Sequence, residues 1–139
     1  MKNLVKLVGI TAFVAIIGFS MIGCDLNNND YELLNGVWDR GDIVVTFNND
    51  NGFFTEIKSI SSTWLPLLNN GTIHIGDRKF RNIKKTGDLK WTCQNLAVPD
   101  GSTTSTTWEE CTIIVNSSGQ TLQTYTPNTT NLYSTYTRK

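Results

Sequence analysis

Two stretches of the chain decide its fold: LKWTC at residues 89–93 and CTIIV at residues 111–115. Apolar and polar residues largely alternate in both, which is the period of a β-strand with one buried face. If the strands pair antiparallel with Cys93 opposite Cys111, one face collects Leu89, Trp91, Cys93, Cys111, Ile113 and Val115. The other face pairs Lys90 with Ile114, Thr92 with Thr112, and Gln94 with Glu110. This separation of apolar from polar residues predicts an antiparallel pair in that register.

Residues 43–58 show the same alternation on both sides of the turn sequence NNDNG at residues 48–52. Asn, Asp and Gly favour tight turns, so this segment predicts a β-hairpin. A turn centred on Asp50 places Phe47 opposite Phe53 and Ile43 opposite Ile57. All four side chains are then expected on one face of the sheet.

Turn residues divide the rest of the chain into further short strands, which we expect at residues 72–75, 78–85, 120–126 and 132–138. A turn at Gly76-Asp77 would place Ile73 opposite Phe80. The apolar cluster WLPLL at residues 64–68 interrupts the pattern and indicates a short helical turn or a lid-like loop. The sequence thus predicts an all-β domain, an antiparallel up-and-down meander of about eight or nine strands whose closure into a small barrel would remove its exposed edges.

The N-terminal residues have a different character. Lys2 and Lys6 precede an uncharged, mostly apolar run over residues 7–19, as in a helical signal peptide. The segment SMIGC at residues 20–24 resembles a bacterial lipobox. The resemblance implies a lipoprotein signal peptide at 1–23, a diacylglycerol and an acyl chain such as palmitate on Cys24, and a flexible tether at 24–33 leading to a domain at 34–139. The alternatives are cleavage without lipidation or an uncleaved anchor.

The lipobox resemblance also places the domain. It implies attachment to a membrane of the bacterial cell envelope, with the domain outside the cytoplasm and the choice between inner and outer membrane open. With Cys24 lipidated, Cys93 and Cys111 remain as an even pair of thiols in an exported protein. Because disulfides persist in oxidising compartments, we expect these two residues to form a disulfide.

Two short motifs suggest a family for the domain. Gly36-Val37-Trp38 precedes the first long strand, and Tyr136-Thr137-Arg138-Lys139 closes the chain. With the meander between them they resemble the calycin group, which comprises lipocalins and fatty-acid-binding proteins. The resemblance implies a lipocalin-like barrel in which Trp38 closes one end and Arg138 packs over its indole ring. The alternative is that Trp38 is an ordinary core aromatic residue and Arg138 a frayed terminal one.

We find no pattern of catalytic residues, and we expect a non-enzymatic protein without cofactor or metal. His74 is the only histidine and is predicted to be exposed, while Glu109 and Glu110 face opposite sides of a strand. The formal net charge of +0 argues against nucleic acid as a partner. We interpret the basic segment from Arg78 to Lys90 as a solvated strand face, with an anionic partner such as acidic lipid head groups as the alternative.

Two functional hypotheses follow, both for a protein that we expect to be a monomer. In the first, the barrel binds a small apolar ligand at a mouth formed by Phe53, Trp64, Leu67 and Ile73. In the second, a filled barrel acts as an interaction or inhibitor module and presents the loop at residues 97–105 to a host protein or a hydrolase. A cavity lined by Trp64, Phe53 and Ile73 would favour the first, and a packed interior the second.

Overall fold

The computed structural model describes residues 30–58, 62–100, 102–127 and 131–139. The predicted signal peptide, Cys24 and most of the predicted tether lie outside these residues. Tyr31–Lys139 forms one compact unit. Within the described ranges there is no helix with the length and apolar character needed to cross a membrane.

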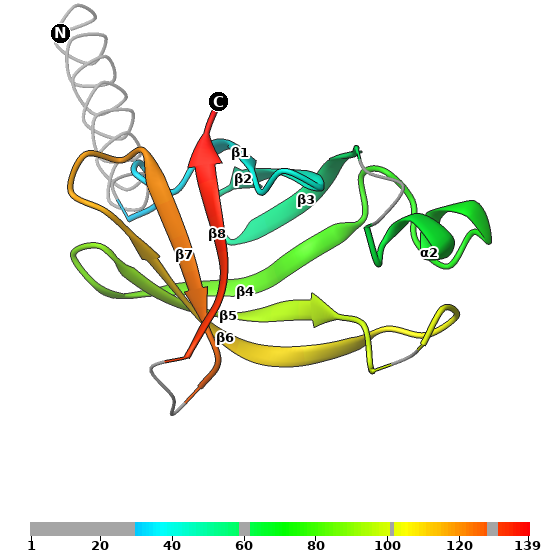
Figure 1. Cartoon of the computed structure of the whole chain (residues 1–139). Helices are drawn as coiled ribbons and strands as arrows, with labels where there is room; N and C mark the ends of the chain where they lie inside the picture. Colours follow the sequence, from blue (N-terminus) through cyan, green and yellow to red (C-terminus); the bar gives the residue numbers. More distant parts are fainter. Residues whose placement is uncertain (1–29, 59–61, 101, 128–130) are drawn as a thin grey trace, which may run out of the picture. The chain divides into compact units, whose positions relative to one another are not determined.

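The described residues form an antiparallel barrel in which each strand pairs with the next in sequence and the last pairs with the first (Figure 1). The strands are β1 (Gly36–Asp39), β2 (Ile43–Asn48), β3 (Asn51–Ile57), β4 (Arg78–Gly87), β5 (Lys90–Ala97), β6 (Thr107–Val115), β7 (Thr121–Tyr125) and β8 (Leu132–Arg138). A short helix, α2 (Leu65–Asn69), lies in the connection from β3 to β4. The predicted all-β up-and-down barrel and the helical turn at the WLPLL cluster are confirmed.

The barrel closes where Trp38 of β1 pairs with Arg138 of β8. The Arg138 guanidinium carbon lies 4.3 Å from the centroid of the Trp38 ring, and the indole Nε1 donates a hydrogen bond of 2.8 Å to the Leu34 carbonyl. Trp38 is completely buried. The predicted contact between the arginine and the indole face is therefore present.

Gly36 is required by the same closure. Its φ is +127°, and a Cβ at this position would lie 2.7 Å from Nη1 of Arg138. The missing side chain lets the guanidinium reach main-chain carbonyls, with Nη1 2.8 Å from the Asn35 oxygen and Nε 2.6 Å from the Gly119 oxygen. The Gly-x-Trp motif thus has a steric reason in this barrel.

The register predicted for the cysteine strands is confirmed: Cys93 lies opposite Cys111 and Trp91 opposite Ile113. The predicted disulfide is not formed. The two cysteine side chains are 4.0 Å apart and both are free and buried, whereas a disulfide joins sulfur atoms at about 2.05 Å. A hydrogen bond between them, followed by burial, raises the pKa of the Cys93 thiol, and the same hydrogen bond lowers the pKa of Cys111.

The first hairpin forms, but one prediction about its register is wrong. Ile43 does face Ile57, whereas Phe47 faces Gly52 instead of Phe53. The turn is the two-residue Asn49-Asp50, with Asn49 in the left-handed region at φ 54°. Gly52 leaves room for Phe47 to stack on Phe80 at 5.1 Å between ring centroids. This register pairs Phe54 with Val45 in the core and leaves Phe53 half-buried. A bulge between the pairs Val45/Phe54 and Val44/Glu56 then restores the predicted pairing of Ile43 with Ile57.

The strand predicted at residues 72–75 does not form, and Ile73 does not pair with Phe80. The amides of Thr72 and Ile73 instead donate to the Leu67 carbonyl, at 2.9 and 3.1 Å. The segment therefore covers the end of α2, and its backbone donors are unavailable to a sheet. Ile73 is nevertheless buried, and its side chain belongs to the hydrophobic core.

The barrel interior is packed with side chains. The hydrophobic core draws on every strand from β1 to β8 and is extended by Leu34, Trp64, Leu67 and Ile73. A barrel of about eight strands is just wide enough for side chains to fill it. Any ligand site is therefore to be sought at an end of the barrel.

Replacing Trp38 with Ala should lower the free energy of unfolding by about 3–5 kcal/mol, because it removes a fully buried indole and leaves a cavity. Trp38→Phe, the matched control, keeps most of the ring contact and should cost only about 0.5–1.5 kcal/mol for the lost hydrogen bond to Leu34. Urea unfolding followed by circular dichroism measures both. Equal stability of wild type and Trp38→Ala would contradict the closing role.

Candidate functional site

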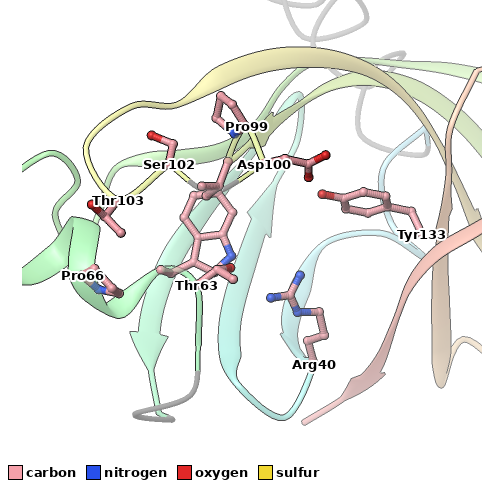
Figure 2. Close-up of a pocket in the computed structure, with 10 residues that line it drawn as sticks. Arg40, Thr63, Pro66, Pro99, Asp100, Ser102, Thr103 and Tyr133 are labelled. Atoms are coloured by element: carbon pink, nitrogen blue, oxygen red, sulfur yellow. The ribbon is translucent and has the colours of Figure 1, made fainter.

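A pocket of about 420 Å³ opens at the end of the barrel where α2 is attached. Its walls come from Arg40 in the β1–β2 turn, the loop that follows β5, Tyr133 of β8, and three residues at the start of α2, namely Thr63, Trp64 and Pro66 (Figure 2). The volume falls within the range of about 300–1,000 Å³ that is usual for small-molecule sites. This pocket is the candidate functional site.

Sequence reasoning found only part of this site. Of the four residues predicted to bind a ligand, Trp64 alone lines the pocket, while Leu67 and Ile73 are packed in the core and Phe53 lies half-buried in β3. The predicted loop at 97–105 does supply one wall, through Val98, Pro99, Asp100, Ser102 and Thr103. Arg40 and Tyr133 were missed, although the predicted contact of Trp38 with Arg138 and the DRGD sequence at residues 39–42 were available clues.

Arg40 is held in place by a bidentate ion pair. Its Nε and Nη2 atoms each donate a hydrogen bond of 2.6 Å to the carboxylate of Asp42. Ser62 donates a third, of 3.0 Å, to the same carboxylate. Burial by itself raises the pKa of Asp42, but hydrogen bonding and charge from Arg40 outweigh burial and lower the pKa overall. The pair thus fixes a guanidinium in the pocket wall.

Lys79 lies directly behind the pocket wall and is completely buried. Its ammonium nitrogen donates to the Asn95 side-chain oxygen and to the Leu96 carbonyl, and it lies 4.7 Å from the centroid of the Trp64 ring. No carboxylate of the described residues forms an ion pair with it. Burial, and then the positive charge of Arg40, lower the pKa of Lys79 to about 7.

A β-bulge explains why a lysine from a basic strand points inward. Gly52 pairs with Phe80 and Phe53 with Arg78, so Lys79 is an extra residue in β4 with no partner in β3. Bulges re-aim side chains in this way, and here Lys79 and Phe80 are both buried although they are neighbours. The prediction that the segment from Arg78 to Lys90 forms one solvated face is therefore wrong at Lys79.

The remainder of the basic segment does lie on the outer surface. Lys84, Lys85 and Lys90 are exposed, and the Arg81 guanidinium carbon stacks 3.9 Å from the centroid of the Trp108 ring. His74 is also exposed, as predicted, and its Nδ1 lies 3.5 Å from the Asp77 carboxylate. Among the described residues no group of three or more His, Cys, Asp or Glu side chains is placed to hold a metal ion.

Two tyrosines of β8 lie close to Arg40. Tyr136 is buried, its ring centroid is 6.0 Å from the Arg40 guanidinium carbon, and its hydroxyl has no hydrogen-bond partner within the described part of the chain. Burial raises the pKa of Tyr136 to about 12 and also raises the pKa of Tyr133. In Figure 2, the Tyr133 hydroxyl and the Arg40 guanidinium both point toward the space below Asp100.

The fold and the site together define a small up-and-down β-barrel with a filled interior and a polar, aromatic pocket at one end. The barrel is compatible with a lipocalin-like fold. No protein-family model matches the chain, and neither the curated proteins nor the solved structures show a significant match. The function is therefore inferred from the site itself.

The pKa of Lys79 predicts an unusual dependence of stability on pH. Below pH 7 the folded protein carries the buried charge and its full penalty; between about pH 7 and pH 10.5 the folded state has lost a proton that the unfolded state keeps. Unfolding free energy should therefore rise with pH in this window, relative to Lys79→Met, by up to about 1.4 kcal/mol per pH unit.

Chemical denaturation of wild type and Lys79→Met between pH 6 and pH 10 measures this difference. The exposed Lys84, from the same strand, provides the control variant Lys84→Met, which keeps Lys79 and should therefore keep the rise of stability with pH. A flat difference for Lys79→Met would show that Lys79 keeps an ordinary pKa in the folded state.

Proposed function

We propose that this protein is a lipid-anchored, non-enzymatic lipoprotein of the bacterial cell envelope whose barrel binds a small, largely apolar ligand. The observation that carries the proposal is the pocket at the α2 end of the barrel. Membrane attachment through Cys24 is supported by the lipobox resemblance of residues 20–24. Attachment and binding are separate parts of the proposal and are tested separately.

The pocket has the composition expected of a ligand site. Apolar surface comes from Trp64, Pro66, Val98 and Pro99. A few polar groups such as Arg40 can fix the orientation of a ligand. Trp64 is held rigidly because its ring packs against Phe54 at 5.0 Å between centroids. A rigid aromatic wall lowers the entropic cost of binding. The ligand would lie at the end of the barrel, since the core side chains occupy the interior.

The second candidate is an interaction or inhibitor module that acts through the loop after β5. The packed core favours it, because a filled barrel leaves the loops as the variable surface. This loop is also tied down: the Asn70 side-chain amide donates to the Thr103 carbonyl at 2.8 Å, and the hydroxyls of Ser102 and Ser105 are 2.6 Å apart. A partner protein would meet an ordered loop.

Small-molecule binding can be tested by titrating a library of aromatic fragments into ¹⁵N-labelled protein lacking residues 1–24. We expect amide shifts to cluster at Arg40, Val98, Thr103 and Tyr133. Val98→Trp should fill the pocket and abolish them, whereas Ile114→Trp on the exposed face of β6 should not. Fragment shifts that survive Val98→Trp would contradict a ligand site here and favour the second candidate.

Lipid anchoring predicts that Cys24→Ser moves the protein from the membrane fraction to the soluble fraction of the producing bacterium, because the residue that would carry the lipid is gone. Cys93→Ser is the control and should leave the protein in the membrane fraction. Fractionation with mass spectrometry of the mature N-terminus measures both. Membrane retention of a cleaved Cys24→Ser protein would refute the anchor.

A further inference from the structure

Lys79 is the feature that ligand binding at the pocket does not by itself explain. We propose, building on the small-molecule site above, that the ligand is an aromatic monocarboxylic acid whose carboxylate binds at the inner wall beside Arg40, with Lys79 as the countercharge behind that wall. Three independent observations lead to this ligand class: the burial of Lys79, the charges around it, and the surfaces of the pocket.

The first observation is the position of Lys79. The β4 bulge turns it into the barrel end, and the indole of Trp64 separates its ammonium group from the pocket, with 4.7 Å from Nζ to the ring centroid. If the Lys79 side chain faced solvent, its ammonium group would keep its hydration. Burial removes this hydration and costs free energy. Side-chain and main-chain oxygens of Asn95 and Leu96 hold the group in place but bring no negative charge.

The second observation is that no carboxylate of the described residues forms an ion pair with Lys79. The charged and titratable groups that act on Lys79 are Arg40, Asp42, Cys93 and Cys111. The Asp42 carboxylate is already engaged by Arg40 and Ser62. Of the two coupled thiols, Cys93 has a raised pKa and Cys111 a lowered one. A negative group arriving beside Arg40 would act on both cations in a poorly solvated region, where Coulomb attraction is strong.

The third observation concerns the rest of the ligand. Trp64 and Tyr133 present aromatic surface, and Pro66 and Pro99 offer flat apolar surface, so a planar ring fits the walls. Asp100 also lines the pocket, and Figure 2 shows its carboxylate beside the Tyr133 hydroxyl, apart from Pro66. A second acid group on the ligand would meet this carboxylate. The pocket therefore selects a single negative charge.

Binding should take up a proton. With a pKa of about 7, Lys79 is largely neutral at pH 8 in the free protein. A nearby carboxylate favours the charged ammonium and raises that pKa, so a proton enters with the ligand. Affinity should consequently fall as pH rises above 7, by at most roughly tenfold per pH unit.

The test compares three probes that share one ring system and differ in charge: 2-naphthylacetate, 2-(2-naphthyl)ethanol and 2-(2-naphthyl)ethylamine. Isothermal titration calorimetry at pH 8 in HEPES and in Tris gives affinity and, from the two buffer enthalpies, the protons taken up. We expect the acid to bind roughly tenfold or more tightly than the alcohol, the amine to bind most weakly, and only the acid to take up a proton, close to one per site.

Three variants separate the role of Lys79 from that of the pocket. Lys79→Met should lose the proton uptake and reduce the preference for the acid, with Arg40 still in place, while still binding the alcohol, which shows that the pocket remains folded. Lys79→Arg should keep the preference without proton uptake, because an arginine is already charged at pH 8. Lys84→Met, the exposed control on the same strand, should behave as wild type.

The outcomes distinguish this inference from the function on which it rests. Equal affinity for acid and alcohol, or an acid preference and proton uptake that are unchanged in Lys79→Met, overturns the role of Lys79 and leaves the small-molecule site standing. Failure of all three probes to bind the wild-type protein overturns both.

Discussion

The barrel depends on one side chain, Arg138, which joins its last strand to its first. The β1–β8 pairing extends over only two residue pairs, Trp38 with Arg138 and Asp39 with Thr137. Arg138 compensates for this short ladder by covering the Trp38 indole and by donating hydrogen bonds to the carbonyls of Leu33, Asn35 and Gly119. These acceptors lie before β1 and between β6 and β7, so a single guanidinium joins β8 to two other parts of the chain. A planar group with five donors can do this, whereas a lysine cannot.

Closure at this size has a consequence for function. Once eight short strands form a ring, their inward side chains meet across the barrel and fill it, as the shared core of β1 to β8 shows. A ligand cannot then occupy the centre. Only the connections between strands can vary in length and shape. The connection between β3 and β4 places α2 and Trp64 over one end of the barrel. The pocket exists because this connection and the loop after β5 form walls above a closed core.

The sequence predicted the fold where strands are regular and failed where they are not. β5 and β6 pair over eight successive residues without a shift, so strict alternation gave the register of Cys93 and Cys111. Alternation cannot reveal a bulge, because one extra residue inverts the faces beyond it. This explains the error at Lys79. The error at Phe53 comes from the turn, because the two-residue turn Asn49-Asp50 shifts the pairing by one residue from a turn centred on Asp50. Residues 72–75 failed for another reason: their alternation is that of a strand, but their amides bond to Leu67.

Lys79 is the residue that the sequence predicted least well, and it is also the residue that most constrains the site. A methionine at position 79 would fill a similar space without charge, and packing alone gives no reason for the bulge that turns a lysine inward. Buried cations are retained in proteins mostly where a partner charge is present or arrives during function. In the described part of this chain the nearby carboxylate of Asp42 is engaged by Arg40, which is why we infer a partner for Lys79 from outside the barrel. The pocket on the other side of Trp64 is the route by which such a partner comes within range of its charge.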